Sequence, residues 1–187
     1  MALLMSRFGL AAATGRKLTP GEIAVARSVF GDQLDYRQVR IHSLPSVIEN
    51  FGGRTTTPFG NIYLEQRFQK PDLSQTPRDQ ALLIHEMTHV WQHQHGRLLP
   101  AEALSQTLQN RFNYDAAYDY DLHSVRDFRA LNLEQQAQFV EDYYVARSNG
   151  VNVALREGLL AKAGLPVKEG LSSFRDISLP NPRVPGV

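Results

Sequence analysis

The sequence predicts a mainly helical α+β domain with a small antiparallel sheet. Residues 76–96 and 132–147 have the apolar spacing of amphipathic helices that bury one face. Residues 36–42 and 55–64 are predicted as strands, the first from its partial alternation and the second from its entry through a proline turn. With 187 residues, of which 42% are hydrophobic and 21% charged, the chain is long enough to bury one core.

A first helix is predicted to begin at Pro20 and to end at Gly31. Thr19 is suited to the N-cap, and Glu22 stands three residues later, which is the spacing of a capping box. In the strand predicted next, at residues 36–42, Val39 and Ile41 are expected to face the core and His42 to lean toward solvent.

The long helix of residues 76–96 has signals at both ends. Thr76 is suited to the N-cap, Pro77 to the first helical position and Asp79 to the positive end of the helix dipole, and Gly96 provides the stop. Its expected apolar surface consists of Leu82, Leu83, Met87, Val90 and Trp91. The helix is therefore predicted to lie largely buried.

The remaining segments are less regular. A short helix is expected at residues 101–109, and the tyrosine- and aspartate-rich stretch 113–129 is expected to form a loop or hairpin over the site described below. We divide the chain into a flexible leader (1–17), one domain (18–150) and a C-terminal extension with a proline-rich tail (151–187).

The central helix carries the motif His-Glu-x-x-His at residues 85–89. Two histidines four positions apart lie on one face of a helix, so both imidazoles can bind a single zinc ion. Glu86 lies beside such an ion without binding it, where it can take a proton from water and pass it to a leaving amine. The motif indicates a metallopeptidase that hydrolyses peptide bonds of a peptide or protein substrate.

A catalytic zinc site needs a third protein ligand. His93 lies eight residues from the first histidine, about 12 Å along the axis, which is too far for one ion. His95 has the metzincin spacing, but Gln92 replaces the glycine of that pattern. The remaining option is a glutamate of the second long helix, as in gluzincins: Glu134 is the first choice and Glu141 the alternative.

Other polar residues are candidates for supporting roles. Tyr118, Tyr120, His123 or Tyr143 can supply the donor that stabilises a tetrahedral intermediate, and Asp142 can orient a ligand histidine. Each of these residues also has an ordinary structural explanation, either packing or exposure to solvent.

The strand before the central helix is a candidate substrate-binding element. If it lies at the edge of the sheet, Gly60, Asn61 and Ile62 can pair with an extended peptide through main-chain hydrogen bonds. An inner strand without this role is the equal alternative.

Composition excludes several classes of function. The sequence has no cysteine, which removes thiol nucleophiles, disulfides and cysteine zinc sites. Its formal net charge of +1 gives no reason to expect nucleic acid or an anionic membrane as a partner. No stretch has the length and apolar content of a transmembrane segment.

Four segments together resemble the HExxH metallopeptidase domains associated with bacterial type VI secretion spike (VgrG) and Rhs proteins. They are LTPGE at 18–22, TPFGNIY at 57–63, LIHEMTHVWQ at 83–92 and NLEQQA at 132–137, the last followed by EDYY at 141–144. The resemblance covers roughly residues 18–148, most of the chain.

This resemblance implies a gluzincin-like, zincin-type fold, one Zn²⁺ ion and Glu134 as the third ligand. It also implies an antibacterial effector toxin that a contact-dependent system carries from the cytoplasm of the producer into target cells, where it acts in the periplasm. The expected partners are then a secretion spike or adaptor and a cognate immunity protein.

Two alternatives use the same motif. A housekeeping or processing peptidase would share the chemistry without toxicity. A non-catalytic zinc-binding module would need a fourth protein ligand, for which His95 is the candidate. Glu86 argues against that module, because a structural zinc site has no use for a base beside the metal.

Overall fold

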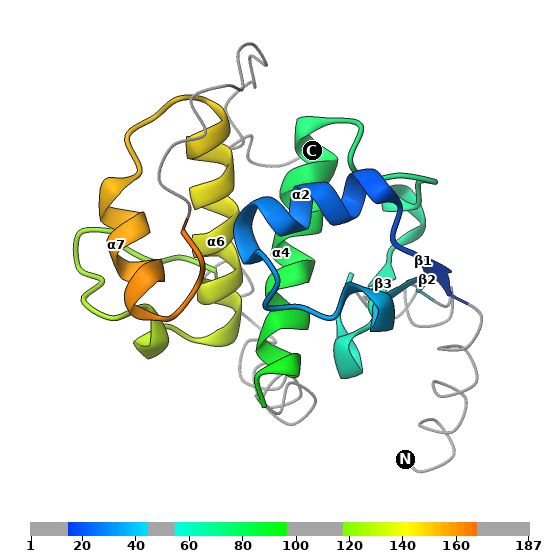
Figure 1. Ribbon diagram of the computed structural model, residues 1–187, viewed down its shortest axis with the longest axis horizontal. Coiled ribbons are helices and arrows are strands. Elements are labelled where there is room, and N and C mark those ends of the chain that lie inside the picture. Colours follow the sequence, from blue (N-terminus) through cyan, green and yellow to red (C-terminus); the bar gives the residue numbers. More distant parts are fainter. Residues whose placement is uncertain (1–14, 45–54, 97–117, 168–187) are drawn as a thin grey trace.

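The computed structural model describes residues 15–44, 55–96 and 118–167 (Figure 1). These residues form four α-helices and a three-stranded sheet. The elements are β1 (Arg16–Lys17), α2 (Pro20–Phe30), β2 (Arg40–Ser43), β3 (Ile62–Leu64), α4 (Pro77–Gln94), α6 (Leu133–Ser148) and α7 (Ala154–Lys162). Short 3-10 turns occur at Tyr36–Gln38, Pro58–Gly60, Gln66–Phe68 and Phe128–Ala130.

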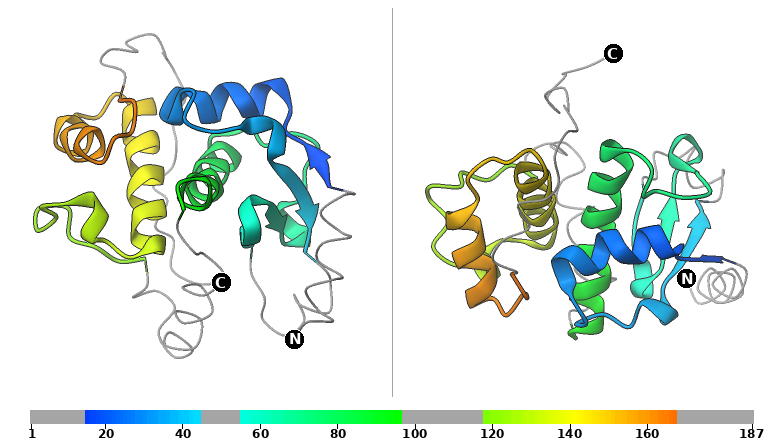
Figure 2. Two further views of the ribbon diagram at one scale, coloured as in Figure 1. Left: turned by 60° about the horizontal axis from the view of Figure 1, so that its bottom comes forward. Right: turned by 45° about the horizontal axis from the view of Figure 1, so that its top comes forward.

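Helix α4 lies at the centre of the described part. Helix α6 packs along one side of it, the sheet lies on the other side, and α2 crosses over it (Figures 1 and 2). Helix α7 packs on α6, away from α4. The fold is thus a mixture of α and β structure in which α4 is enclosed by other elements.

One core joins these elements. It contains residues from every α-helix and from two of the three strands. Its fully buried members include Phe30, Val39, Ile62, Leu64, Leu83, Ile84, Met87, Val90, Phe139, Val140 and Leu160. Within the described ranges, no helix combines the length and apolar character needed to cross a bilayer.

The caps predicted for α2 and α4 are confirmed. Thr19 and Thr76 cap α2 and α4, and each side-chain oxygen accepts a hydrogen bond from the backbone N–H three residues later. Asn132 caps α6, and together with Gln135 it forms a second capping box. Helix α4 ends at Gln94, just before the predicted stop.

The sheet is mixed, so the prediction of an antiparallel sheet is wrong in part. Strand β1 is antiparallel to β2, but β2 and β3 run parallel. The connection between Ser43 and Ile62 is longer than the dozen residues that a parallel crossover needs. A connection of this length allows β3 to run parallel to β2, so the spacing of the two strands in the sequence did not determine the direction of β3.

The first predicted strand is shorter than expected. Its N-terminal half forms the turn Tyr36–Gln38, which Asp35 caps, and β2 begins only at Arg40. Val39 and Ile41 are buried as predicted. His42 is also buried instead of facing solvent, because its ring stacks on Tyr63 at a centroid distance of 4.6 Å.

Several boundaries differ from those expected. Arg16 and Lys17, which we assigned to the leader, form β1, and α7 lies in the segment that we assigned to the C-terminal extension. Helix α7 has no side-chain cap, so its start had no sequence signal, yet Leu159 and Leu160 join the core. The predictions for residues 1–14, the helix at 101–109, positions 113–117 and the tail from 168 lie outside the described residues.

A buried carboxylate links three parts of the fold. Glu22 has no exposed surface, and its oxygens accept hydrogen bonds from Arg16 at 2.7 and 2.8 Å, from Thr19 N at 2.8 Å and from Leu73 N at 2.9 Å. It therefore joins β1, the start of α2 and the segment that leads into α4.

We expect Glu22→Ala to destabilise the fold by about 3 kcal/mol, because it leaves a guanidinium and two N–H groups without their acceptor. For a chain of this size the midpoint of thermal unfolding should fall by roughly 6–12 °C, measurable by circular dichroism. Glu22→Gln keeps an acceptor and should lose less. Equal, small shifts in both variants would contradict this role.

Candidate metal centre

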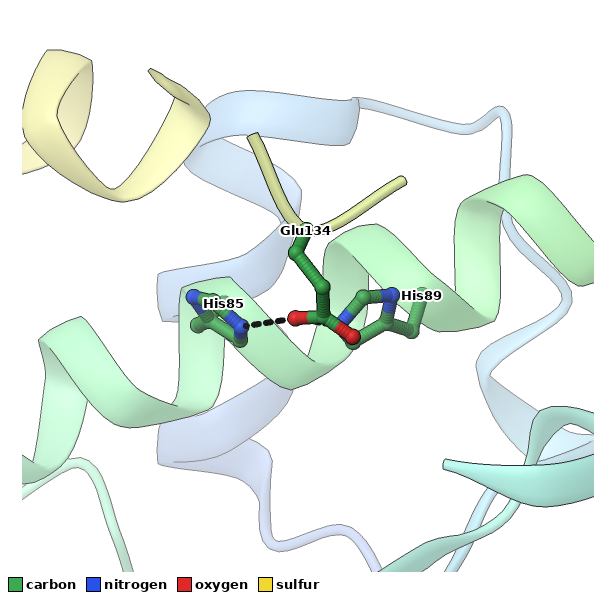
Figure 3. Close-up of side chains that lie close together, drawn as sticks. All are labelled: His85, His89 and Glu134. Atoms are coloured by element: carbon green, nitrogen blue, oxygen red, sulfur yellow. Dashed lines mark ion pairs between the residues drawn. The ribbon is translucent and has the colours of Figure 1, made fainter. Parts of the chain in front are cut away.

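Two packed helices bring the predicted ligands together. His85 and His89 lie one turn apart on the side of α4 that faces α6, and Glu134 stands in the first turn of α6. Glu134 Oε2 lies 3.5 Å from His85 Nε2 and 3.3 Å from His89 Nε2. Figure 3 shows this carboxylate between the two imidazoles. One ligand atom from each residue lies within 4.8 Å of the others.

The second nitrogen of each imidazole has its own partner. His85 Nδ1 lies 3.0 Å from Glu141 Oε2, and His89 Nδ1 lies 2.8 Å from Gln92 Oε1. Such partners fix the ring orientation and leave Nε2 to bind a metal. Glu141, our alternative third ligand, therefore sits on the opposite side of the His85 ring from Glu134.

The orientation of Gln92 follows from its other contacts. Its Nε2 donates to the carbonyl of Leu133 and to Gln136 Oε1, both at 3.0 Å, so its oxygen must face His89. Gln136 in turn donates to the carbonyl of Leu131. This buried network defines His89 Nδ1 as the donor and leaves a lone pair on Nε2.

The electrostatics of the cluster favour positive charge beside its carboxylates. Burial lowers the pKa of His85, but hydrogen bonds and charge interactions with Glu134 and Glu141 outweigh it and raise that pKa to about 10. The pKa of His89 is also raised, with burial again opposed by Glu134. Burial raises the pKa of Glu134, but both histidines lower it further, so the net value lies below the usual range.

The donor set fits zinc. Two imidazole nitrogens and one carboxylate oxygen are the ligands of many catalytic zinc sites, which keep a fourth position for water or substrate. Among the described residues His95 is not part of the cluster: it is exposed at the end of α4, where its Nδ1 lies 2.8 Å from the carbonyl of Trp91.

The glutamate of the motif is held by a residue that sequence analysis did not assign to the site. Glu86 is buried, and its Oε2 accepts a hydrogen bond of 2.6 Å from the Thr57 hydroxyl, which is buried as well. Thr57 immediately precedes the Pro58–Gly60 turn, which packs against α4. The hydrogen bond occupies one carboxylate oxygen and fixes the direction of the other.

Of the other candidates, only Tyr118 contacts a ligand histidine in the described contacts. Its ring centroid lies 5.9 Å from that of His85. The Tyr120 hydroxyl donates to Asp142 at 2.5 Å, and Asp142 does not contact a ligand histidine in the described contacts. The residues that orient His85 and His89 are instead Glu141 and Gln92. Tyr143 is buried with its hydroxyl near Arg147 and Glu157, and His123 is exposed.

The proposed peptide-binding edge is partly occupied by the chain itself. Strand β3 is last in the sheet order, but Tyr63 exchanges two backbone hydrogen bonds with Thr56, at 2.8 and 3.1 Å. Asn61 N donates to the carbonyl of Pro58, and Ile62 is fully buried. The sheet therefore offers no backbone groups to a substrate at Tyr63, and the exposed part of this region is the preceding turn.

A prediction distinguishes the two glutamates of α6. If Glu141 only orients His85, then Glu141→Ala should weaken zinc binding by about 10-fold to 100-fold without abolishing it. Glu141→Gln retains an acceptor for Nδ1 and should lose less. Competition with a chelator of known affinity measures both variants. Complete loss of zinc in Glu141→Ala would instead make Glu141 a direct ligand.

The fold and the site define a class: a helical α+β domain in which an HExxH helix and a glutamate from a second helix form one candidate metal centre. A profile of the eCIS core domain family matches residues 24–97, which include the C-terminal part of α2 and all of α4. The chain is also 38% identical, over 140 residues and 73% of its length, to the type VI secretion system spike protein VgrG2b of Pseudomonas aeruginosa.

A solved structure is similar over most of the chain. It is the effector domain of Pseudomonas aeruginosa VgrG2b, with 35% identity, a TM-score of 0.63, and coverage of 80% of this chain and 84% of that domain. The chain therefore belongs to the family of the VgrG2b effector domain. It spans 14% of the length of the whole VgrG2b spike protein. The predicted link to type VI secretion spike proteins is thus confirmed at the level of the family.

Proposed function

We propose that this chain is a zinc-dependent metallopeptidase that acts as an antibacterial type VI secretion effector. The observation that carries the proposal is the cluster of His85, His89 and Glu134 with buried Glu86 next to the first histidine. A structural zinc site has no need of such a base, whereas metal-assisted peptide hydrolysis requires one.

In this mechanism His85, His89 and Glu134 would hold the zinc ion. When bound, zinc polarises the scissile carbonyl and lowers the pKa of a water molecule toward neutrality. Glu86 accepts the proton of the attacking water and then gives it to the leaving amine. The hydrogen bond from Thr57 keeps one Glu86 oxygen occupied, so the other faces the reacting groups.

Tyr118 is our choice for the donor to the developing oxyanion. It is the one predicted donor whose ring lies against a ligand histidine in the described contacts. A hydroxyl at that position would stabilise negative charge on the carbonyl oxygen.

The family supports the proposed biological role. VgrG2b is a type VI secretion spike protein, and the similar structure is its effector domain. We therefore infer delivery into target cells by a spike or adaptor, action in the periplasm and protection of the producer by an immunity protein. Peptide or protein substrates are expected in that compartment.

Expression in a bacterial host tests the proposal. The wild-type chain and Glu86→Gln are each directed to the cytoplasm or the periplasm, and growth and zinc content are measured. We expect only the periplasmic wild type to stop growth, although both proteins bind zinc. Equal toxicity of both proteins would contradict a peptidase mechanism, and absence of toxicity with bound zinc would favour a housekeeping peptidase.

A further inference from the structure

The turn before β3 contains a strained, exposed aromatic residue. Phe59 has φ +54° and ψ +30°, and it is the single non-glycine residue with positive φ among the described residues. L-residues with bulky side chains rarely adopt this left-handed conformation. The side chain is nevertheless 49% exposed, so burial in the core does not explain why a phenylalanine occupies this strained position.

Contacts on both sides of Phe59 hold the turn against α4. Thr57 donates to Glu86 at one end. At the other end the backbone of Gly60 lies directly on the His93 ring, where an added Cβ would come within 2.7 Å of Cδ2. Gly60 also has positive φ, +73°. Contacts of Thr57 and Gly60 therefore hold the backbone on both sides of Phe59.

These anchors place the turn beside the candidate metal centre. At about 100° per residue, Glu86 and His93 lie on one face of α4. His89 lies between them along the helix axis and is rotated by roughly 60° from Glu86 around that axis. The turn thus forms a wall next to the ligand face. Phe59 lies between the two anchored residues and provides an exposed apolar side chain on that wall.

We propose that Phe59 is a substrate-contacting residue that receives a large apolar side chain of the peptide close to the scissile bond. The inference rests on the proposed peptidase function. An aromatic face buries much apolar surface on contact and selects for apolar partners. Strained residues persist where they serve a site, since glycine or asparagine would adopt this backbone at lower cost.

The test compares Phe59→Asn with Val151→Asn in the full, zinc-loaded chain. Asparagine tolerates the left-handed conformation, so the first change removes the aromatic ring without adding strain. Val151 is similarly exposed, at 57%, but lies three residues beyond Ser148, the last residue of α6, which is about 10 Å along that helix from Glu141. It is the matched control for loss of an exposed apolar side chain.

Two fluorogenic peptide pools serve as probes. They are identical except that one carries phenylalanine and leucine at positions where the other carries alanine. We expect Phe59→Asn to raise KM for the apolar pool about tenfold, with kcat within about twofold, and to change the alanine pool little. Val151→Asn should leave both pools as in the wild type.

Binding and stability separate this inference from the proposed function. In a Glu86→Gln background, fluorescence anisotropy should show the same tenfold weaker binding of the apolar pool in Phe59→Asn. The unfolding midpoint should stay at or above that of the parent. If peptides bind with this dependence but the wild type cleaves none, the peptidase proposal fails and the role of Phe59 stands. Binding that is absent or unchanged, or a midpoint lowered by more than about 4 °C, would overturn it.

Discussion

Glu86→Gln is expected to reduce peptide hydrolysis by about 10²-fold to 10⁴-fold, the usual contribution of a general base. The amide keeps the size of the side chain and can still accept the hydrogen bond from Thr57, but it cannot take a proton from water. Single-turnover cleavage of a fluorogenic peptide measures the rate, and elemental analysis measures bound zinc.

Thr57→Val is the informative companion variant. It keeps the carboxylate but removes the hydroxyl that orients it, so we expect a smaller loss of about tenfold in kcat.

Zinc content and the unfolding midpoint of Glu86→Gln should match the wild type. Undiminished hydrolysis by Glu86→Gln would rule out Glu86 as the base.

Glu134→Ala is expected to weaken zinc binding by more than about 10²-fold, beyond the range of changes that only orient a ligand. The carboxylate is the one anionic member of the cluster, and it lies 3.3 and 3.5 Å from the two Nε2 atoms. Two neutral imidazoles alone provide too few ligands for a catalytic zinc site. Hydrolysis should be lost together with the metal.

Gln138→Ala provides the control for this variant. Gln138 stands one turn further along α6, and its amide contacts Asp142 and not the cluster. Its zinc affinity should equal that of the wild type in the same chelator competition. Stoichiometric zinc in Glu134→Ala at low nanomolar free metal would exclude Glu134 as a ligand.

The parts of the structure that sequence predicted well depend on neighbouring residues. Thr19 and Thr76 cap their helices because a cap needs only its own first turn. The pairing of His85 with His89 likewise follows from helix periodicity alone. The closeness of Gln92 to His89 was predictable in the same way, since Gln92 stands three residues later on the helix. Its position on the helix does not reveal which buried groups outside α4 it will contact.

Features that depend on packing between distant segments were not determined by the sequence pattern. Glu134 and Glu141 are seven residues apart and share one face of α6, so only the packing of α6 on α4 decides which ring nitrogen each approaches. Thr57 and Glu86 are 29 positions apart. The direction of β3 depends on a long crossover, and α7 begins without a capping side chain.

The amide network of Gln92 has a consequence for the proposed metal centre. Because Gln92 joins His89 to Leu133 and Gln136, protein hydrogen bonds link one ligand histidine on α4 to the start of α6. Removal of metal should then be a reversible loss of activity and not an unfolding event. On the proposed metallopeptidase function, a chain built in this way would be able to release and rebind zinc while it remains folded.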